Sequence, residues 1–98
     1  MASSRSSGLK TADAVITTGR NRINAITLLG DGTNAASLIL YDNASAASGT
    51  KVSFMAVPAA TTAPSSIIFA NPIQCNNGIY ADVTGTNATY IVLYSLGA

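Results

Sequence analysis

The sequence predicts an all-β fold, an antiparallel jelly-roll-like β-sandwich preceded by an N-terminal arm. From Ile23 onward the chain consists of short runs rich in β-branched and aromatic residues. Between them lie segments rich in Gly, Pro, Asn and Asp, which accept turn geometry. None of these segments is long enough to hold a long helix. Several short strands at spacings of roughly 8 to 15 residues, without intervening helices, indicate a sandwich or barrel.

Six strands are expected from Ile23 onward, with residues 13–18 as a candidate for a further strand, and turn residues separate the six along the chain. The segments GDGTNAA, DNASAASGT, PAATTAPS, NPIQCNN and TGTN are expected to be turns or loops. With residues 1–12 as an arm, the sandwich domain would cover residues 13–98. The expected strands, with the candidate first, are residues 13–18, 23–29, 37–41, 51–57, 66–70, 78–83 and 88–94.

The alternation of apolar side chains in INAITLL changes parity in the middle of the run. Apolar side chains occupy Ile23 and Ala25, and then Ile26 and Leu28. Successive residues of a strand point to opposite faces, so this change predicts a β-bulge or the end of a strand.

The run TYIVLY is apolar on both faces, so each face requires cover. We expect one face to join the sandwich core and the other to be covered by the N-terminal segment or by a second subunit. A loop of the same chain is the alternative. One face would hold Thr89, Ile91 and Leu93, and the other Tyr90, Val92 and Tyr94.

The composition favours association with other chains. The chain has 98 residues, of which 48% are hydrophobic and 9% charged, whereas charged residues make up about 25% of an average soluble domain. A small domain also leaves much of its apolar surface exposed. We therefore expect a homo-oligomer, with a trimer favoured.

Positive charge is concentrated near the N-terminus. Residues 1–22 contain Arg5, Lys10, Arg20 and Arg22 against Asp13, a net charge of +3, while the remaining chain has one lysine and three aspartates, a net charge of −2. We expect these four basic residues to lie at a partner interface. The Ser-rich residues 1–12 are expected to be held by a neighbouring chain. Four basic residues without interleaved aromatic rings do not predict nucleic-acid binding.

Few residues could carry catalytic chemistry, and we expect no enzymatic activity, no cofactor and no metal site. His and Glu are absent, and the chain has four aspartates, whereas acid–base catalysis usually needs His or paired carboxylates. Asp31, Asp42 and Asp82 are expected to stabilise turns through their own backbone. A calcium site at Asp31 or Asp42 is the alternative, although no D-x-D-x-D loop is present. We interpret GDGTN as a hairpin turn rather than a phosphate loop, because no helix follows it.

The remaining sequence features concern Cys75 and targeting. The single cysteine is expected to be a small buried apolar side chain. No signal-peptide core and no run of about 18 apolar residues is present, so we expect synthesis in the cytoplasm and no membrane insertion. The sequons at residues 43–45 and 87–89 are accordingly expected to stay unmodified.

The pattern ITLLGDGTNAASLILYDNASAASGTKV, followed by NPIQCNNGIYADVTGTNATYIVLY, resembles small β-sandwich virion proteins of tailed bacteriophages. The resemblance runs from about Ile23 to Tyr94 and leaves the basic N-terminal segment outside. It implies a virion protein, made in the host cytoplasm, that decorates or cements the capsid or forms part of a head fibre, neck or tail. It implies contacts with the major capsid protein or another virion protein, and it supplies no catalytic residues.

Two classes of function therefore remain, a structural virion subunit and a carbohydrate-binding or receptor-binding module. Sugar sites usually present exposed aromatic platforms with acidic or amide groups. The chain has no Trp, and Tyr41, Tyr80, Tyr90 and Tyr94 all lie in expected strands rather than in loops. We therefore favour the structural subunit, a capsid decoration protein first.

Overall fold

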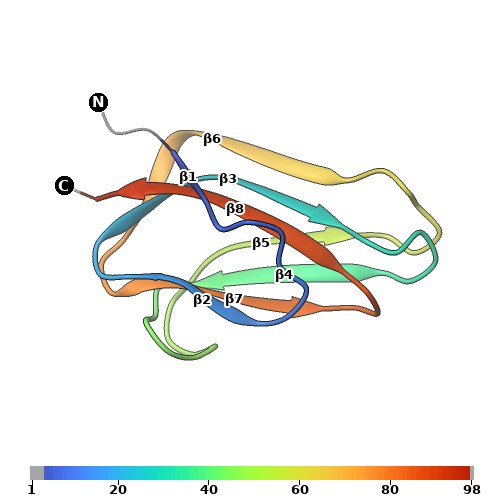
Figure 1. Ribbon diagram of the computed structural model, residues 1–98, viewed down its shortest axis with the longest axis horizontal. Helices are drawn as coiled ribbons and strands as arrows, with labels where there is room; N and C mark the ends of the chain where they lie inside the picture. The colour runs from blue at the N-terminus through green and yellow to red at the C-terminus, as the bar shows by residue number, and fades with distance from the viewer. Residues whose placement is uncertain (1–3, 98) are drawn as a thin grey trace.

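The computed structural model describes residues 4–97 and confirms the all-β prediction. Eight strands form two antiparallel four-stranded sheets that face each other as a sandwich (Figure 1). Within residues 4–97 no helix is long and apolar enough to span a lipid bilayer. The strands are β1 (Arg5–Ser6), β2 (Ala14–Thr18), β3 (Asn21–Leu29), β4 (Ala36–Tyr41), β5 (Lys51–Val57), β6 (Ser65–Cys75), β7 (Gly78–Thr84) and β8 (Thr89–Leu96).

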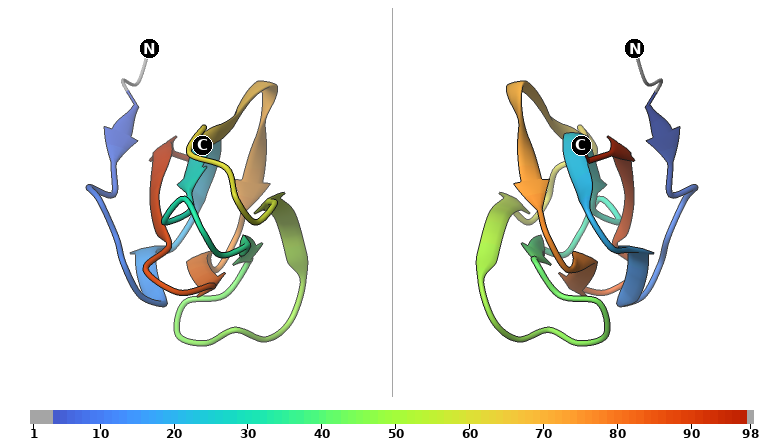
Figure 2. Two further views of the ribbon diagram at one scale, coloured as in Figure 1. Left: turned by 90° about the vertical axis from the view of Figure 1, so that its right-hand side faces the viewer. Right: turned by 90° about the vertical axis from the view of Figure 1, so that its left-hand side faces the viewer.

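The two sheets have the strand orders β1-β8-β3-β6 and β2-β7-β4-β5. We call the first sheet A and the second sheet B. Figure 2 shows β1 and β2 along one side of the sandwich and β5 and β6 along the opposite side. The four strands at these two sides are the sheet edges, while β8, β3, β7 and β4 are central.

The core lies between the sheets and is built from alternate residues of the strands. Side chains at every second position point to one face of a strand, and in β4 the positions of Leu38 and Leu40 are fully buried. Burying a Leu or Ile side chain contributes roughly 1.5–3 kcal/mol. The largest fully buried apolar side chains are Ile23, Ile26, Leu28, Leu38, Leu40, Ile79, Tyr90 and Val92.

The change of parity in β3 is a β-bulge, as the sequence predicted. Ile23 pairs with Tyr94 of β8, but Ala25 pairs with the next residue, Leu93, so Asn24 is an extra residue. Ile23 and Ile26 are consequently both buried although they are three residues apart. The bulge lets the strand keep its apolar side chains in the core on both sides of Asn24.

The prediction that NPIQCNN is a turn was wrong, because β6 continues to Cys75. In the pairing with β3, Ile68 lies opposite Ala25 and Ile73 opposite Ile23, so four residues of β6, including Pro72, face the single residue Asn24. A proline cannot donate a ladder hydrogen bond, but it is tolerated at edge strands and bulges. Both conditions are met at Pro72, since β6 is the edge of sheet A.

The expectation that β-structure begins no earlier than Asp13 was also wrong. Arg5 and Ser6 form β1 and pair with Tyr94 and Leu93 of β8. Further along the segment, Lys10 forms an isolated bridge with Tyr90. Residues 1–3 of the expected arm, and Ala98, lie outside the described residues.

Candidate interaction surfaces

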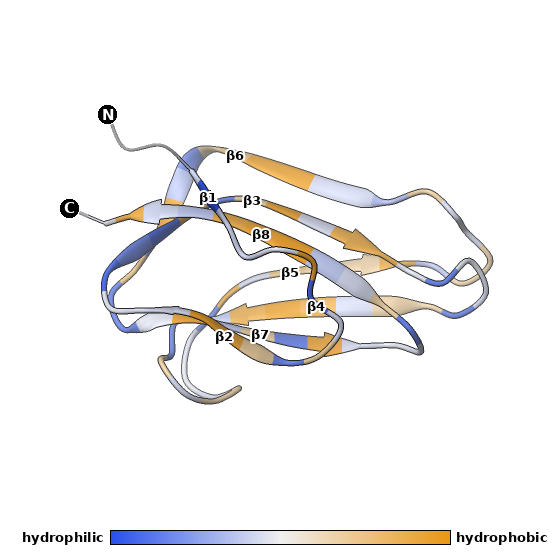
Figure 3. Ribbon diagram, in the orientation of Figure 1, coloured by the Kyte–Doolittle hydropathy of each residue, from blue (hydrophilic) through white to orange (hydrophobic). Residues whose placement is uncertain are grey.

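The four basic residues predicted to meet a partner do not form one cluster. Arg5 in β1 lies in the same row across sheet A as Tyr94 and Ile23, and Arg22 lies one row further along. Arg20 is in the turn before β3, at the end of the sandwich where β8 finishes, because its carbonyl accepts from the Gly97 amide at 2.9 Å. Figure 3 shows the start of β3 in the hydrophilic colour. Three of the four residues therefore share one end of the molecule.

Lys10 is separated from that end by the length of the N-terminal segment. It lies opposite Tyr90, four residues along β8 from the partner of Arg5, which corresponds to about 13 Å at the rise of a β-strand. The Arg22 guanidinium is engaged within the chain, since its Nε donates to Oε1 of Gln74 at 3.2 Å. Arg5 and Arg20 are exposed, so they are the basic side chains best placed to meet another molecule.

The N-terminal segment is held by β8 of the same chain. The Ser7 amide donates to the Val92 carbonyl at 2.9 Å, and the Val92 amide donates to the Ser7 hydroxyl at 2.9 Å. Lys10 and Tyr90 exchange two backbone hydrogen bonds, both 2.9 Å long. The segment thus covers the edge of β8 and satisfies backbone groups that would otherwise be unpaired there.

The Tyr90 side chain fixes the far end of this segment. Its hydroxyl donates to the Ala12 carbonyl at 2.7 Å, and the residue is almost fully buried. Burial, with smaller contributions from Asp13 and Tyr80, raises the pKa of Tyr90 to about 12. Both observations describe a phenol kept neutral as a structural donor.

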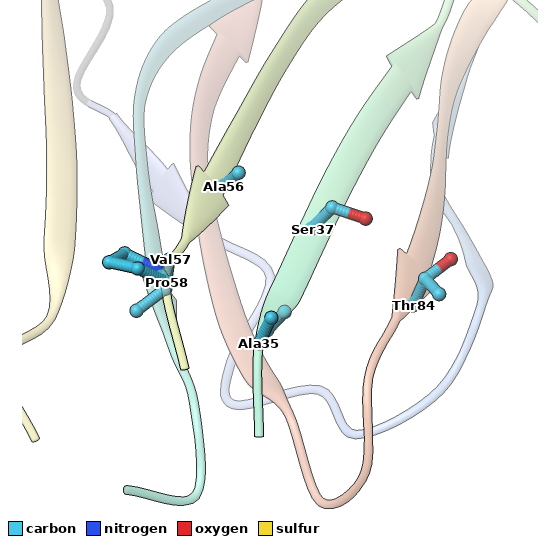
Figure 4. A pocket seen from close by; sticks show the side chains of 7 residues that line it. Ala35, Ser37, Ala56, Val57, Pro58 and Thr84 are labelled. Carbon is cyan, nitrogen blue, oxygen red and sulfur yellow. The ribbon is translucent and has the colours of Figure 1, made fainter. Parts of the chain in front are cut away.

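The outward face of sheet B carries apolar side chains together with one carboxylate, Asp82. Across its strands, Ile39 pairs with Phe54 on one side and Asp82 on the other. The Phe54 side chain is 75% exposed, the largest exposure of an aromatic residue in the described chain. Next to this row, a shallow hollow of about 480 Å³ lies where β4 begins and where β5 and β7 end (Figure 4).

The hollow presents methyl groups and two hydroxyls but no charge. The Ser37 and Thr84 hydroxyls come from neighbouring strands, and the side chains of Ala35, Ala56 and Pro58 complete the lining (Figure 4). A surface of this kind can pack against small apolar side chains and accept a few hydrogen bonds. None of its lining residues is titratable, so the lining provides no base that could activate either hydroxyl as a nucleophile.

The outward face of sheet A is also poor in charge. Ile68, Ala25 and Leu93 form one row across β6, β3 and β8. In the next row the hydroxyls of Thr27 and Ser66 are hydrogen-bonded to each other at 3.0 Å. Ile68 is 84% exposed, the most exposed of the large hydrophobic side chains in the described residues. The N-terminal segment lies along the edge of β8, so it covers only part of the outward face of that strand.

Asp31 stabilises its own turn, as the sequence predicted. Its Oδ1 accepts from the amides of Thr33 and Asn34 at 2.9 and 2.7 Å, and its Oδ2 accepts from the Asn34 side chain at 2.9 Å. These hydrogen bonds, led by the one from the Asn34 amide, lower the pKa of Asp31. The carboxylate is thus occupied as a turn acceptor, an Asx turn in GDGTN.

Asp42 and Asp82 do not stabilise turns through their own backbone, so that prediction was wrong for them. Asp42 accepts instead from the amide of Asn77, which is 35 residues away, at 2.8 Å. Asp82 lies within β7. Burial raises the pKa of Asp82, and the neighbouring carboxylate of Asp13 raises it further. Asp13 accepts from the Val83 amide at 2.8 Å, which fixes its position close to Asp82.

Cys75 is fully buried at the end of β6, as predicted. Burial, with a smaller effect of Asp42, raises the pKa of the Cys75 thiol to about 11. Residues 4–97 bring no three His, Cys, Asp or Glu side chains together as a metal site would require.

Comparisons of this chain with protein-family models, with curated proteins and with solved structures give no match. The surfaces therefore have to be interpreted from their own chemistry. Sequence reasoning singled out the four basic residues, whose role stays a prediction, and it did not single out Phe54 or Ile68. Strand alternation could have placed both on outward faces, because Met55 and Ile67 beside them point inward.

Proposed function

We propose that the protein is a structural subunit of a bacteriophage virion, a capsid decoration or cement protein that associates with itself and with the capsid lattice. The observation that carries this proposal is the chemistry of the outward faces. Both sheets expose apolar side chains, led by Ile68 and Phe54, in a chain with 9% charged residues. Exposed apolar surface of this kind is typical of protein contacts.

The strand order supports a jelly roll, a fold that viral capsid proteins use. The pairs β1–β8, β2–β7, β3–β6 and β4–β5 are those of one long antiparallel hairpin whose ends are β1 and β8. Rolling that hairpin up adds the pairs β3–β8 and β4–β7. Jelly rolls also occur in lectins, so the topology supports a virion protein without excluding a sugar-binding module.

The tyrosines argue against the carbohydrate-binding alternative. Tyr41 and Tyr90 are buried, while Tyr80 and Tyr94 are half-buried in strands. A sugar platform needs an aromatic ring that is open to solvent. Among the aromatic side chains of the described residues, only Phe54 is exposed, and it is not a tyrosine. A head-fibre, neck or tail subunit belongs to the same structural class and differs from a decoration protein in copy number.

Docking to the major capsid protein would use the basic end of the sandwich. Arg5 and Arg20 are exposed there, and electrostatic complementarity guides encounter and orientation. A single exposed ion pair contributes about 0–1 kcal/mol, but many subunits on one lattice multiply it. We favour a trimer, seated on local threefold positions of the capsid.

The test is sedimentation of the purified protein with phage heads that lack it. The wild-type protein is expected to co-sediment with heads, and the double variant Arg5→Gln, Arg20→Gln to bind more weakly and with a smaller dependence on salt. A variant with Lys10→Gln is the matched control, since it also removes positive charge but lies opposite Tyr90, about 13 Å along β8 from the partner of Arg5. Absence of binding by the wild-type protein at any salt concentration would refute the proposed function.

A further inference from the structure

The side of the sandwich formed by β5 and β6 differs from the opposite side in how its edges are covered. At the opposite side, β1 and the following segment hydrogen-bond along β8. β6 pairs with β3 alone, so its outer edge presents backbone N–H and C=O groups to solvent within the described chain. Such an edge is a ready template for another strand.

Charge, the usual protection of an exposed edge, is missing from this side. Residues 52–81 contain no Asp, Glu, Lys or Arg. This stretch includes all of β6 and all of β5 after Lys51. The Pro72 ring interrupts pairing in the second half of β6, but Ser65–Ala70 has neither charge nor proline. These six residues can therefore accept a partner strand.

We propose that Ser66–Ala70 of β6 pairs antiparallel with the same segment of a second copy of this chain, about a two-fold axis at Ile68. The proposal rests on the self-association inferred above and names its surface. Residues directly opposite each other in an antiparallel pair lie on the same face of the sheet. A register that places Ile68 opposite Ile68 therefore pairs the outward side chains of one copy with outward side chains of the other.

The same register completes the core at the edge. Ile67 then lies opposite Phe69 of the second copy, and both are inward side chains that are only half-buried in the single chain. Ser66 lies opposite Ala70, so small side chains flank the two Ile68 side chains. One pairing thus covers the most exposed large hydrophobic side chain and two incompletely buried ones.

The distribution of positive charge favours the antiparallel arrangement. Lys51 begins β5, and Arg22 binds Gln74 near the end of β6. Because β5 and β6 run in opposite directions (Figure 1), these two basic groups lie at the same end of the β5–β6 side of the sandwich. A two-fold axis places the basic ends of the two copies far apart, whereas parallel pairing would bring them together.

The size of this side suits a stable contact. The molecule measures 40 × 27 × 19 Å, and the strands of each sheet succeed one another along the shortest dimension (Figures 1 and 2). The β5–β6 side therefore lies within 40 × 27 Å, an upper limit that exceeds the roughly 800 Å² that each partner buries in a standard interface. A two-fold contact is isologous, so in a trimeric decoration subunit it would join neighbouring trimers.

The first test is sedimentation equilibrium of Ile68→Lys. The side chain is exposed in the single chain, so the variant is expected to fold, with unchanged far-UV circular dichroism, and to lose the two-fold contact. Leu9→Lys is the matched control, because Leu9 is 65% exposed in the N-terminal segment, which lies along β8 rather than β6, and it should associate like the wild type. Unchanged association of Ile68→Lys would overturn the proposal while leaving self-association through another surface intact. A monomeric wild type at high concentration would instead refute both.

The second test is covalent trapping with Ile68→Cys. Opposed residues in an antiparallel pair have Cα atoms about 4.5–5.5 Å apart, within the range of a disulfide. Mild oxidation should give a cross-linked dimer of Ile68→Cys. The wild type should stay uncross-linked because Cys75 is buried, and Leu9→Cys is the control for an exposed thiol elsewhere. Equal cross-linking of Ile68→Cys and Leu9→Cys would contradict the register.

Discussion

Replacing Tyr90 by Phe tests whether the N-terminal segment is an integral part of the sandwich. The substitution removes one hydroxyl, which donates to the Ala12 carbonyl at 2.7 Å, and leaves the buried ring in place. Loss of a hydrogen bond of this kind costs about 0.5–1.5 kcal/mol. For a domain of this size, a change of 1 kcal/mol shifts Tm by about 4–8 °C. We therefore expect Tm to fall by several degrees.

Three measurements make this prediction specific. Thermal unfolding should show the fall for Tyr90→Phe and a smaller one for Tyr94→Phe, whose ring lies on the same strand but is half-buried. Hydrogen exchange of the Lys10 amide should accelerate, because its bond to the Tyr90 carbonyl depends on the same contact. In a spectrophotometric titration, the variant should lack the tyrosine that ionises near the pKa of about 12. An unchanged Tm together with unchanged exchange at Lys10 would refute the anchoring role.

The remaining predictions concern backbone geometry, pH dependence and thiol reactivity. Gly85→Ala should destabilise the protein more than Gly19→Ala, as measured by urea denaturation. Both glycines have positive φ. A Cβ at Gly85 would lie 2.7 Å from a backbone oxygen, whereas a Cβ at Gly19 would have no atom within 4 Å. Asp82→Asn should raise the urea midpoint at neutral pH. Because the folded state raises the pKa of Asp82, the wild type should gain stability as the pH falls through that pKa, and the gain should be absent in the variant; a parallel pH dependence of both proteins would contradict this. Cys75 should fail to react with a thiol reagent at pH 8 unless denaturant is added, since burial raises its pKa to about 11; rapid reaction of the native protein would show that the strand end opens.

Much of the architecture could be predicted because local patterns and the fold agree. Turn residues separate six of the strands, and the parity change between Ala25 and Ile26 correctly indicated the bulge. The end of β6 was missed because Pro72 and the Asn residues are typical of turns. Their place at a sheet edge and opposite a bulge, which makes them tolerable in a strand, depends on tertiary pairing.

The interaction surfaces were harder to predict than the strands. The composition predicts a chain that associates with itself, but it does not show which face of the sandwich is exposed for that contact. The composition of the segment around Lys10 is typical of a polar arm. Its pairing with β8 is made by backbone groups, so its side chains do not predict it. The exposure of Ile68 follows from the position of β6 at the edge of sheet A, and strand order is a long-range property of the fold.

Quantitative mass spectrometry of purified particles can test the proposal that this protein is a structural subunit of a virion. Particles of a phage that encodes this chain should contain it in a copy number comparable with that of the major capsid protein. Removing its gene should leave heads that break at a lower temperature, because a subunit that binds only the assembled lattice stabilises that state. Absence of the protein from purified particles would contradict the account.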